Sequence, residues 1–576
     1  MTETSSTTKA VRRYAPIAVV AAVVVGAVAL FGGGGGGDDD VEDARAVDSA
    51  ETTEAGDEPS EVDDGIPVTF TEAEEAGDDV DFGEGCDTET GRLKIPLRNA
   101  APCIAPFEEG ADNGGATSPG VTADSIKVVV YQGLPDPLTQ AAAAEAGADT
   151  DVDVALQTSL EYLTMFEDVY ETYGRTLDVE VVKASGGPSD ATAALADARA
   201  VIDKEPFAVV GGPGQTSAYW EELAAAEILC MGTCTLAEGR ENIAAVAPYV
   251  WPTGLAPEQA DVHLAELIGK QLVGKPAAFA GDEAMRGDER VFGWVQAETE
   301  TGEYAARNEA FDALLAEEYG GEIATRSTYL FDPSAAQETA TTVVARMRDA
   351  GVTTVILSVD PIVPKNITEE ATKQGWFPEW VVGPSVLADT VIFGRTYDQQ
   401  QWRNAIGLSL GAATAGDELS DSYFVYEWYF GKPPETNTHG VILPGPAQLM
   451  LGIHLAGPEL TPESFRDGLF DRYVPREPGR TFTSVSWGED VWDQPDYNSS
   501  DDASVFWWDP DVAGEDETGN EGTGMKRFVD GGQRYFPGGW PEEPIPFFEE
   551  EGTVTSYDEL PEGEAHPDYP PWPGRG

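Results

Sequence analysis

Basic residues, histidines and cysteines are scarce in this chain. Its 34 lysines and arginines face 104 acids in 576 residues, so the formal net charge is −70. Such a field repels phosphate backbones and anionic surfaces, which excludes nucleic acid as a partner. The four histidines, His263, His439, His454 and His566, are scattered and form no cluster with cysteine. We therefore expect no metal site and no cofactor.

Long apolar runs are also rare, and the most pronounced lies near the start, at 15–31. Basic residues within 1–14 precede it, and glycines and aspartates follow it. This pattern predicts that the N-terminus is cytoplasmic and that most of the protein lies outside the cytoplasm. The run is at the lower end of what spans a bilayer. An Ala-x-Ala pattern at 27–29 leaves a cleaved signal open. We favour an uncleaved anchor, with the protein on the extracytoplasmic face of the cell membrane.

The four cysteines fall into two pairs. Residues 32–120 are acidic and poor in aromatics, which predicts a tether. Within it, Cys86 and Cys103 are spaced for a disulfide loop in an exported chain. Cys230 and Cys234 would lie about 13 Å apart in an extended strand, beyond the roughly 7 Å limit between bridged Cα atoms. A disulfide there requires a turn at Gly232, and the alternative is two buried free thiols.

Apolar spacing predicts an alternation of strands and helices from residue 126 onward. The first series has strands at 126–133, 177–185 and 207–211, with helices at 154–173 and 190–205 between them. The second has strands at 276–282, 322–331, 353–360 and 380–384, with helices at 308–319, 334–349 and 367–374. An extended crossing and a helix from about Pro257 separate the two series. The sequence therefore predicts two parallel α/β lobes joined by a hinge.

Several stretches together carry a family resemblance. They are GVTADSIKVVVYQG, FAVVGGPGQTSAYWEELAAAEILCMGT, PYVWPTG, DAGVTTVILSVD and VVGPS. In order and spacing they resemble the extracellular solute-binding proteins of branched-chain amino-acid ABC transporters, over roughly residues 120–540. The resemblance implies a two-lobed type I periplasmic-binding-protein fold that clamps a small ligand and is not an enzyme. It places lobe I at 121–250 and about 385–470, and lobe II at 251–384 and about 471–540.

The loops at strand ends supply the expected ligand contacts. Gln215, Thr216 and Ser217 stand where a strand ends and a helix begins, so backbone N–H groups, hydroxyls and the helix dipole converge there. The alternative is that Thr216 or Ser217 only caps its helix. The resemblance adds Thr233, Cys234 and Thr235 as a second contact loop, and the alternative is that they form a turn without ligand contact. Tyr249 and Trp251 at the crossing either stack on a ligand or pack the hinge.

The chain departs from the family where an amino acid's ammonium is held. Ser385 stands where members carry an acid after Gly-Pro, and in the stretch GLAPEQ after the crossing Glu258 is at best near the position of the other acid. Asp282, Glu283 and Asp360, at other expected strand ends, could supply negative charge. The sequence therefore predicts a small polar ligand, and it disfavours an amino acid unless these acids supply the missing charge.

Two functions follow from these features. The first is a membrane-tethered solute-binding protein that presents its ligand to an ABC permease. The second is a membrane-anchored extracellular sensor or surface component that kept the fold without transport. The aromatic stretch at 487–508 is expected to pack on the lobes, because large rings are usually buried. Residues 541–576, rich in proline, glutamate and glycine, are expected to form a disordered tail.

Overall fold

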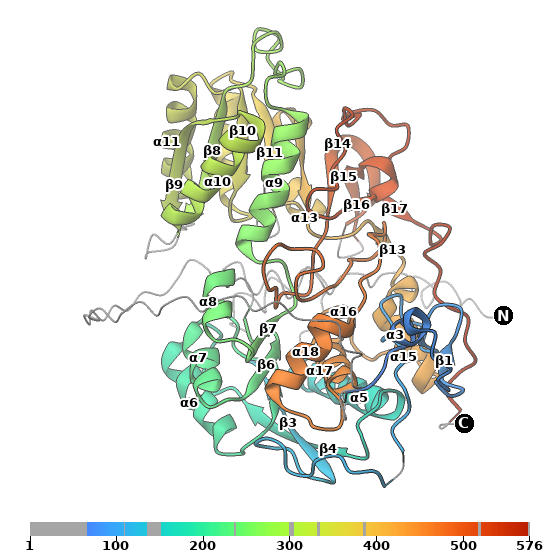
Figure 1. The fold of residues 1–576 in the computed structure, drawn as a ribbon. Helices are drawn as coiled ribbons and strands as arrows, with labels where there is room; N and C mark the ends of the chain where they lie inside the picture. Colours follow the sequence, from blue (N-terminus) through green and yellow to red (C-terminus); the bar gives the residue numbers. More distant parts are fainter. Residues whose placement is uncertain are drawn as a thin grey trace, which may run out of the picture.

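The computed structural model describes residues 66–108, 110–134, 151–235, 238–298, 304–330, 335–383, 388–516 and 520–573. Figure 1 shows two bodies, one above the other, each with a sheet between helices. We call the lower body lobe I and the upper body lobe II. The predicted α/β class with parallel sheets flanked by helices is confirmed. The run at 15–31 lies outside the described residues, and within them we find no helix with the length and apolar character of a membrane span.

Lobe I is built on five parallel strands in the order β4-β3-β5-β6-β7. Their bounds are β3 (Ser125–Gln132), β4 (Thr176–Lys183), β5 (Ala208–Val210), β6 (Leu229–Gly232) and β7 (Val250–Pro252). β3 and β4 pair in register from Ser125 opposite Thr176 to Gln132 opposite Lys183. The central strands are mostly apolar and buried, as expected for parallel strands covered by helices on both faces.

The helices of lobe I come from two parts of the chain. The first part supplies α5 (Val152–Val169), α6 (Ala191–Ile202), α7 (Ser217–Ala225) and α8 (Arg240–Ala245). The later part supplies α15 (Asp421–Phe430), α16 (His439–Ile442), α17 (Pro444–Ala456) and α18 (Pro462–Arg472). α5 begins after Asp151, whose side chain accepts N–H groups of the first turn, and its buried face includes Leu163 and Phe166. The helices predicted at 154–173 and 190–205 are thus found as α5 and α6.

Lobe II repeats the order of lobe I and then extends it. Its strands run β9-β8-β10-β11-β12 in parallel, followed by the antiparallel β14, β15 and β16. Their bounds are β8 (Phe292–Glu298), β9 (Ile323–Leu330), β10 (Thr354–Ser358), β11 (Glu379–Val382), β12 (Ala405–Ser409), β14 (Ala503–Glu515), β15 (Glu521–Phe528) and β16 (Arg534–Tyr535). Counted along the chain, both parallel sheets therefore have the order 2-1-3-4-5.

The helices of lobe II cover both faces of this sheet. They are α9 (Pro257–Gln271), α10 (Tyr304–Tyr319), α11 (Ala336–Asp349), α12 (Val363–Lys373), α13 (Val391–Gly394) and α14 (Gln399–Trp402). The strand predicted at 276–282 is wrong, because those residues form turns and β8 occupies that place in the sheet. Alanine and glycine dominate 276–282, whereas β8 carries the aromatic and branched side chains that favour strands.

Three segments, 253–256, 410–420 and 473–502, join the lobes. The second lies later than the expected boundary near residue 385. β12 pairs in parallel with β11, so the chain completes the lobe II sheet before it returns to lobe I at α15. Within the second crossing lie β13 (Thr414–Ala415) and a short 3-10 turn at Asp417–Leu419.

The described part of the predicted tether, 66–120, differs from a tether. It contains α3 (Phe70–Ala76) and the hairpin of β1 (Cys86–Asp87) and β2 (Arg92–Leu93). The predicted Cys86–Cys103 disulfide is confirmed, with Cα atoms 5.6 Å apart. Ile95 and Ile104 are buried in the lobe I core. The acidic composition of the whole segment masked these apolar residues, which are enough to pack the segment against lobe I.

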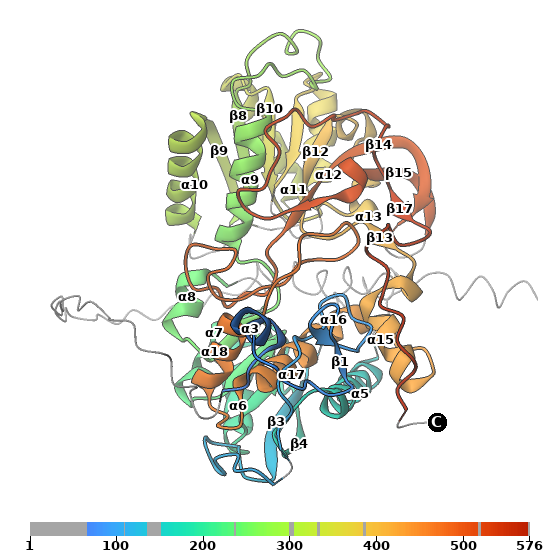
Figure 2. The same ribbon diagram turned by 45° about the vertical axis from the view of Figure 1, so that its right-hand side comes forward.

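The prediction of a disordered tail at 541–576 is also wrong for the residues that the structure describes, 541–573. Ile545 and Phe547 are buried in the lobe II core. Farther on, β17 (Ser556–Tyr557) pairs with β13 of the second crossing. Figure 2 shows the dark red C-terminal segment descending from β17 past α15 to lobe I. The aromatic residues Trp487, Trp492 and Trp508 are buried, as expected.

Candidate functional site

The topology places the candidate site at the carboxyl ends of the parallel strands. β7 leads through the short segment 253–256 into lobe II, and β12 leads back toward lobe I. Because the five strands of lobe I are parallel to one another, as are β8 to β12 of lobe II, the carboxyl edge of each parallel set faces the other lobe. In a 2-1-3-4-5 sheet the ligand site lies where the order reverses, between the first and third strands. Those strands are β3 and β5 in lobe I, and β8 and β10 in lobe II.

In lobe I, the loop after β5 carries Gln215, Thr216 and Ser217 to this edge. Gly211 and Gly214 adopt φ values of 92° and 75°, which favour glycine. The Thr216 hydroxyl accepts the Ala218 N–H at 3.4 Å and caps α7. The capping alternative therefore describes Thr216, while ligand contact by Gln215 and Ser217 stays a prediction. The first N–H groups of α7 point toward the same edge.

The second predicted loop lies directly beside the first. Gly214 forms a β-bridge with Thr235. The Cys230–Cys234 disulfide is confirmed, with Cα atoms 5.9 Å apart and the chain turning at Gly232, where φ is 74°. Cys234 and Thr235 are buried, whereas Thr233 is exposed, so of the three Thr233 is the most accessible to a ligand. The loop given by the family resemblance therefore lies next to the loop at 215–217.

The two aromatic residues predicted at the crossing are not at this edge. Trp251 is fully buried, donates from Nε1 to the Pro248 carbonyl at 2.6 Å, and packs against Phe465 and Tyr497 at ring distances of 5.4 and 5.0 Å. Burial raises the pKa of Tyr249, and the nearby charge of Glu227 adds to it. Tyr249 precedes β7 and Glu227 precedes β6, so both lie at the amino edge. These side chains pack lobe I and are not placed to stack on a ligand.

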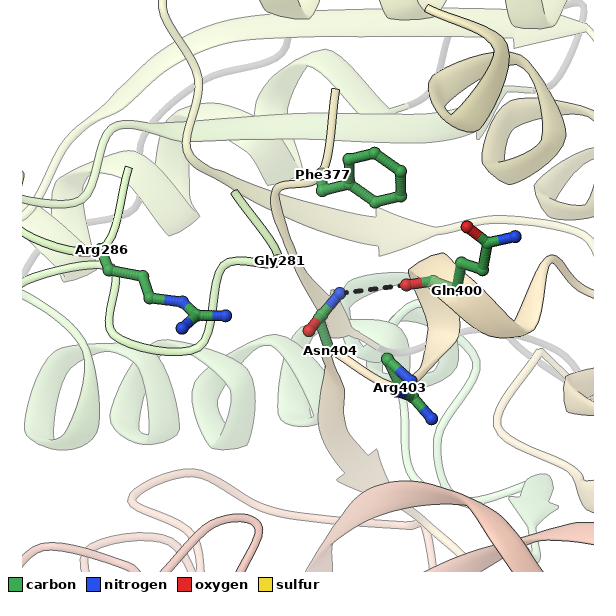
Figure 3. A pocket seen from close by; sticks show the side chains of 6 residues that line it. All are labelled: Gly281, Arg286, Phe377, Gln400, Arg403 and Asn404. Atoms are coloured by element: carbon green, nitrogen blue, oxygen red, sulfur yellow. Dashed lines mark hydrogen bonds between the residues drawn. The ribbon is translucent and has the colours of Figure 1, made fainter. Parts of the chain in front are cut away.

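Asp282 and Glu283 also lie at the wrong edge. The Asp282 N–H donates to the carbonyl of Phe377, which comes just before β11. The residues around them border a cavity of about 360 Å³, lined by Gly281, Arg286, Phe377, Gln400, Arg403 and Asn404 (Figure 3). Because Asn404 directly precedes β12, this cavity opens at the amino edge of the lobe II sheet. It is therefore separate from the candidate site.

Asp360 does lie at the predicted edge, but its carboxylate is already engaged. It follows β10 and accepts the N–H groups of Ile362 and Val363 at 2.7 and 2.9 Å, while Tyr329 donates its hydroxyl to the other oxygen. Burial raises the pKa of Asp360, and these hydrogen bonds oppose the rise. Asp360 therefore holds the start of α12. Ser385 lies outside the described residues.

Apolar side chains at the same edges were not predicted. Leu134 just after β3, Leu330 at the end of β9 and Ile362 after β10 are 47%, 52% and 37% exposed. Solvent-exposed leucine and isoleucine at three strand ends give the edges an apolar character. In the sequence, only their position at or just beyond the predicted strand ends could have indicated that these side chains lie at the site. Within the residues that the structure describes, no group of three histidine, cysteine or acidic residues could hold a metal ion.

Comparisons with known proteins found similar solved structures. No protein-family model and no curated protein matches the sequence. Among solved structures, one similar protein is a solute-binding protein of an ABC transporter from Rhodopseudomonas palustris HaA2, in complex with p-hydroxybenzoic acid. It is 13% identical, with 70% of this chain and 97% of that chain covered and a TM-score of 0.46.

Two further structures have similar statistics. A fatty acid ABC transporter substrate-binding protein from Thermomonospora curvata is 15% identical, covers 76% of this chain and 98% of its own, and has a TM-score of 0.42. An extracellular ligand-binding receptor from Verminephrobacter eiseniae is 10% identical, covers 67% and 97%, and has a TM-score of 0.42. The candidate site is therefore assigned from the strand order and the crossing segments of this chain alone.

Proposed function

We propose that the protein is an extracytoplasmic solute-binding protein that closes two lobes on a small ligand. One observation carries this proposal: two sets of five parallel strands with the same order turn their carboxyl edges, with their switch points, toward each other across three crossing segments. Ligands bind at such switch points. Crossing segments between two packed lobes allow hinge closure around a molecule held between them.

The side chains at the two edges favour a ligand with a polar group and an apolar part. Lobe I contributes the start of α7 with Ser217 and the exposed Thr233, which suit a hydrogen-bonding group. Lobe II contributes Leu330 and Ile362, which suit an apolar part. An ammonium group would need a carboxylate, and that of Asp360 is committed to α12 and Tyr329. These features support a small polar ligand other than an amino acid.

The location and partner belong to the same proposal. The run at 15–31 would anchor the protein in the cell membrane, with the lobes on the extracytoplasmic face. Its partner would be the permease of an ABC transporter. An anchor that is retained would also suit a second role, a surface sensor without transport, because a tethered receptor does not diffuse to a transporter. A permease gene beside the gene for this protein would favour transport.

The ligand loop can be tested by two neighbouring substitutions. With a ligand found by thermal-shift screening, Ser217→Ala should weaken binding about 2- to 12-fold, the worth of one net hydrogen bond of about 0.5 to 1.5 kcal/mol. Thr216→Ala, the control, should leave affinity unchanged and lower stability by about 1 kcal/mol, since Thr216 caps α7. Calorimetry and urea unfolding separate these effects. Unchanged affinity in Ser217→Ala would remove this side chain from the site.

A further inference from the structure

The C-terminal segment makes a fourth connection between the lobes. It starts inside lobe II, where Trp540, Ile545 and Phe547 are buried at 2%, 9% and 7% exposure. Gln271 of α9 donates to the Pro541 carbonyl at 2.7 Å and accepts the Ile545 N–H at 3.0 Å. This first part of the segment is an integral part of the lobe II core.

The segment then follows the crossings. Ser556 and Tyr557 of β17 pair with Thr414 and Ala415 of the second crossing. Farther along, the Glu564 carboxylate accepts the N–H groups of Arg480 and Thr481, both at 2.9 Å, in the third crossing. The segment therefore ties two of the three crossing segments together before it reaches lobe I.

Its last described residues rest on one face of α15. The Trp428 indole donates to the Pro570 carbonyl at 2.7 Å, and the Trp572 ring packs 5.7 Å from Trp428 and 6.1 Å from Tyr429. Earlier along the segment, His566 stacks on Phe424 at 4.3 Å and 12°. We call the side chains of Phe424, Trp428 and Tyr429 the α15 surface.

Two further contacts hold the ends of this arrangement. The Tyr569 hydroxyl donates to Asp87 at 2.7 Å, next to the Cys86–Cys103 disulfide. Burial raises the pKa of Tyr569 and its bond to Asp87 adds to the rise, so the hydroxyl remains a donor. On the other side, His566 lies 3.2 Å from the Asp421 carboxylate, which also binds Arg98 at 3.0 Å. Burial opposes ionisation of Asp421, but Arg98 and His566 hold its pKa at about 2.

The chemistry of residues 559–573 suits a reversible contact. In this stretch Glu564 and the side chain of His566, 3% exposed, are buried, while Tyr569 and Trp572 stay partly exposed, in contrast with the deeply inserted 540–547. Prolines at 567, 570, 571 and 573 fix the backbone in advance, so docking loses little conformational entropy. Indole donation to a proline carbonyl with aromatic packing beside it is how aromatic surfaces bind proline-rich segments. The segment thus combines a permanent root in lobe II with a surface-bound end on lobe I.

We propose that the α15 surface is a recognition surface for a proline-rich segment, and that its occupant is the chain's own residues 559–573. When docked, this strap fastens lobe II to lobe I, and it restrains the second crossing through His566, whose Nε2 lies 3.0 Å from the Leu419 carbonyl, and the third through Glu564. When released, it leaves the lobes free to separate farther. The strap would thereby set how far the lobes open, independently of which ligand they bind.

The test uses the full chain, folded before the strap is cut. A protease recognition sequence is inserted between Asp558 and Glu559, both exposed in a bend, so that β17 stays in place. After cleavage the strap fragment should remain bound through size-exclusion chromatography and be displaced by excess synthetic peptide 559–573. Its loss should raise the radius of gyration and speed hydrogen exchange at 410–420 and 474–484, and added peptide should reverse both changes.

Matched peptides test the recognition itself. Binding of the peptide to the cleaved, fragment-free protein should weaken at least about 10-fold with Trp572→Ala, which removes the ring packed on the α15 surface. Asp568→Asn, at an exposed position of the same segment, should bind like the original. Immediate loss of the fragment, equal binding of both peptides, or unchanged exchange and radius of gyration after its removal would each overturn the proposal. So would exchange of the strap between two copies in a stable dimer.

Discussion

Arg534 shows how one buried side chain can hold together parts of the chain that are far apart in sequence. It is fully buried with Asp502, to which its Nε donates at 2.9 Å. Its two remaining nitrogens donate to the Gly411 and Leu410 carbonyls at 2.6 and 2.8 Å. One guanidinium therefore joins β16, the start of β14 and the start of the second crossing.

We expect Arg534→Met to lower the free energy of unfolding by about 3 to 5 kcal/mol, because the Asp502 carboxylate stays buried without its partner. Arg403→Met is the control, since the Arg403–Asp511 pair is 3.4 Å apart and exposed, and should cost at most about 1 kcal/mol. Urea unfolding measures both variants. The double variant Arg534→Met, Asp502→Asn should recover part of the loss. Equal small losses in both single variants would contradict this account.

At the scale of elements, the sequence predicted those whose apolar spacing is regular. β3, β4, α5, α6, α11 and β10 lie within a few residues of their predicted positions. It misplaced the strand at 276–282, where alanine and glycine gave an apolar run with poor strand propensity. It also missed the docking of 66–120 and of the tail. Their few buried residues, such as Ile95 and Ile545, are diluted by acidic and proline-rich neighbours in any average over composition.

The third crossing is an element that local patterns could not reveal. It is irregular, and its hydrogen bonds run to the first crossing: Asn498 donates to the Gly254 carbonyl at 2.6 Å, and Ser499 and Ser500 donate to that of Thr253 at 3.0 Å. Asp496 lies within it and accepts from Gln259 of α9 and from the Asn498 N–H. Burial raises the pKa of Asp496 to about 6, against these bonds and the charge of Arg240.

This raised pKa predicts a pH dependence at the crossing. Between about 3.9, the unfolded value, and about 6, the folded state binds the proton more tightly, so the contribution of Asp496 to stability falls as pH rises. The unfolding free energy of the native chain minus that of Asp496→Asn should therefore drop by about 1 to 3 kcal/mol from pH 4 to pH 7. Urea unfolding across this range measures the difference. A difference that stays constant or grows with pH would contradict the shift.

At the scale of the whole molecule, the sequence predicted two parallel α/β lobes joined by a hinge, but it did not predict the strand order, and it predicted the site residues only in part. The loop at 215–217 was predicted because it follows a predicted strand, and the loop at 233–235 because of the family resemblance. For Trp251 the packing alternative applies, because its ring is buried against Phe465 and Tyr497, which are far away in the sequence. Asp360 lies at the predicted edge, but the pattern could not show that its carboxylate is engaged by Tyr329 of β9 and by the start of α12. Asp282 was misjudged because one wrong strand moved it to the opposite edge of the sheet.

The central claim is that the two lobes close on a ligand bound at their facing edges. Small-angle X-ray scattering of the full chain, with and without a saturating ligand found by thermal-shift screening, tests it most directly. We predict a smaller radius of gyration at saturation, accompanied by slower hydrogen exchange at 253–256. A radius of gyration that does not change at saturation, with binding confirmed by calorimetry on the same sample, would contradict the account.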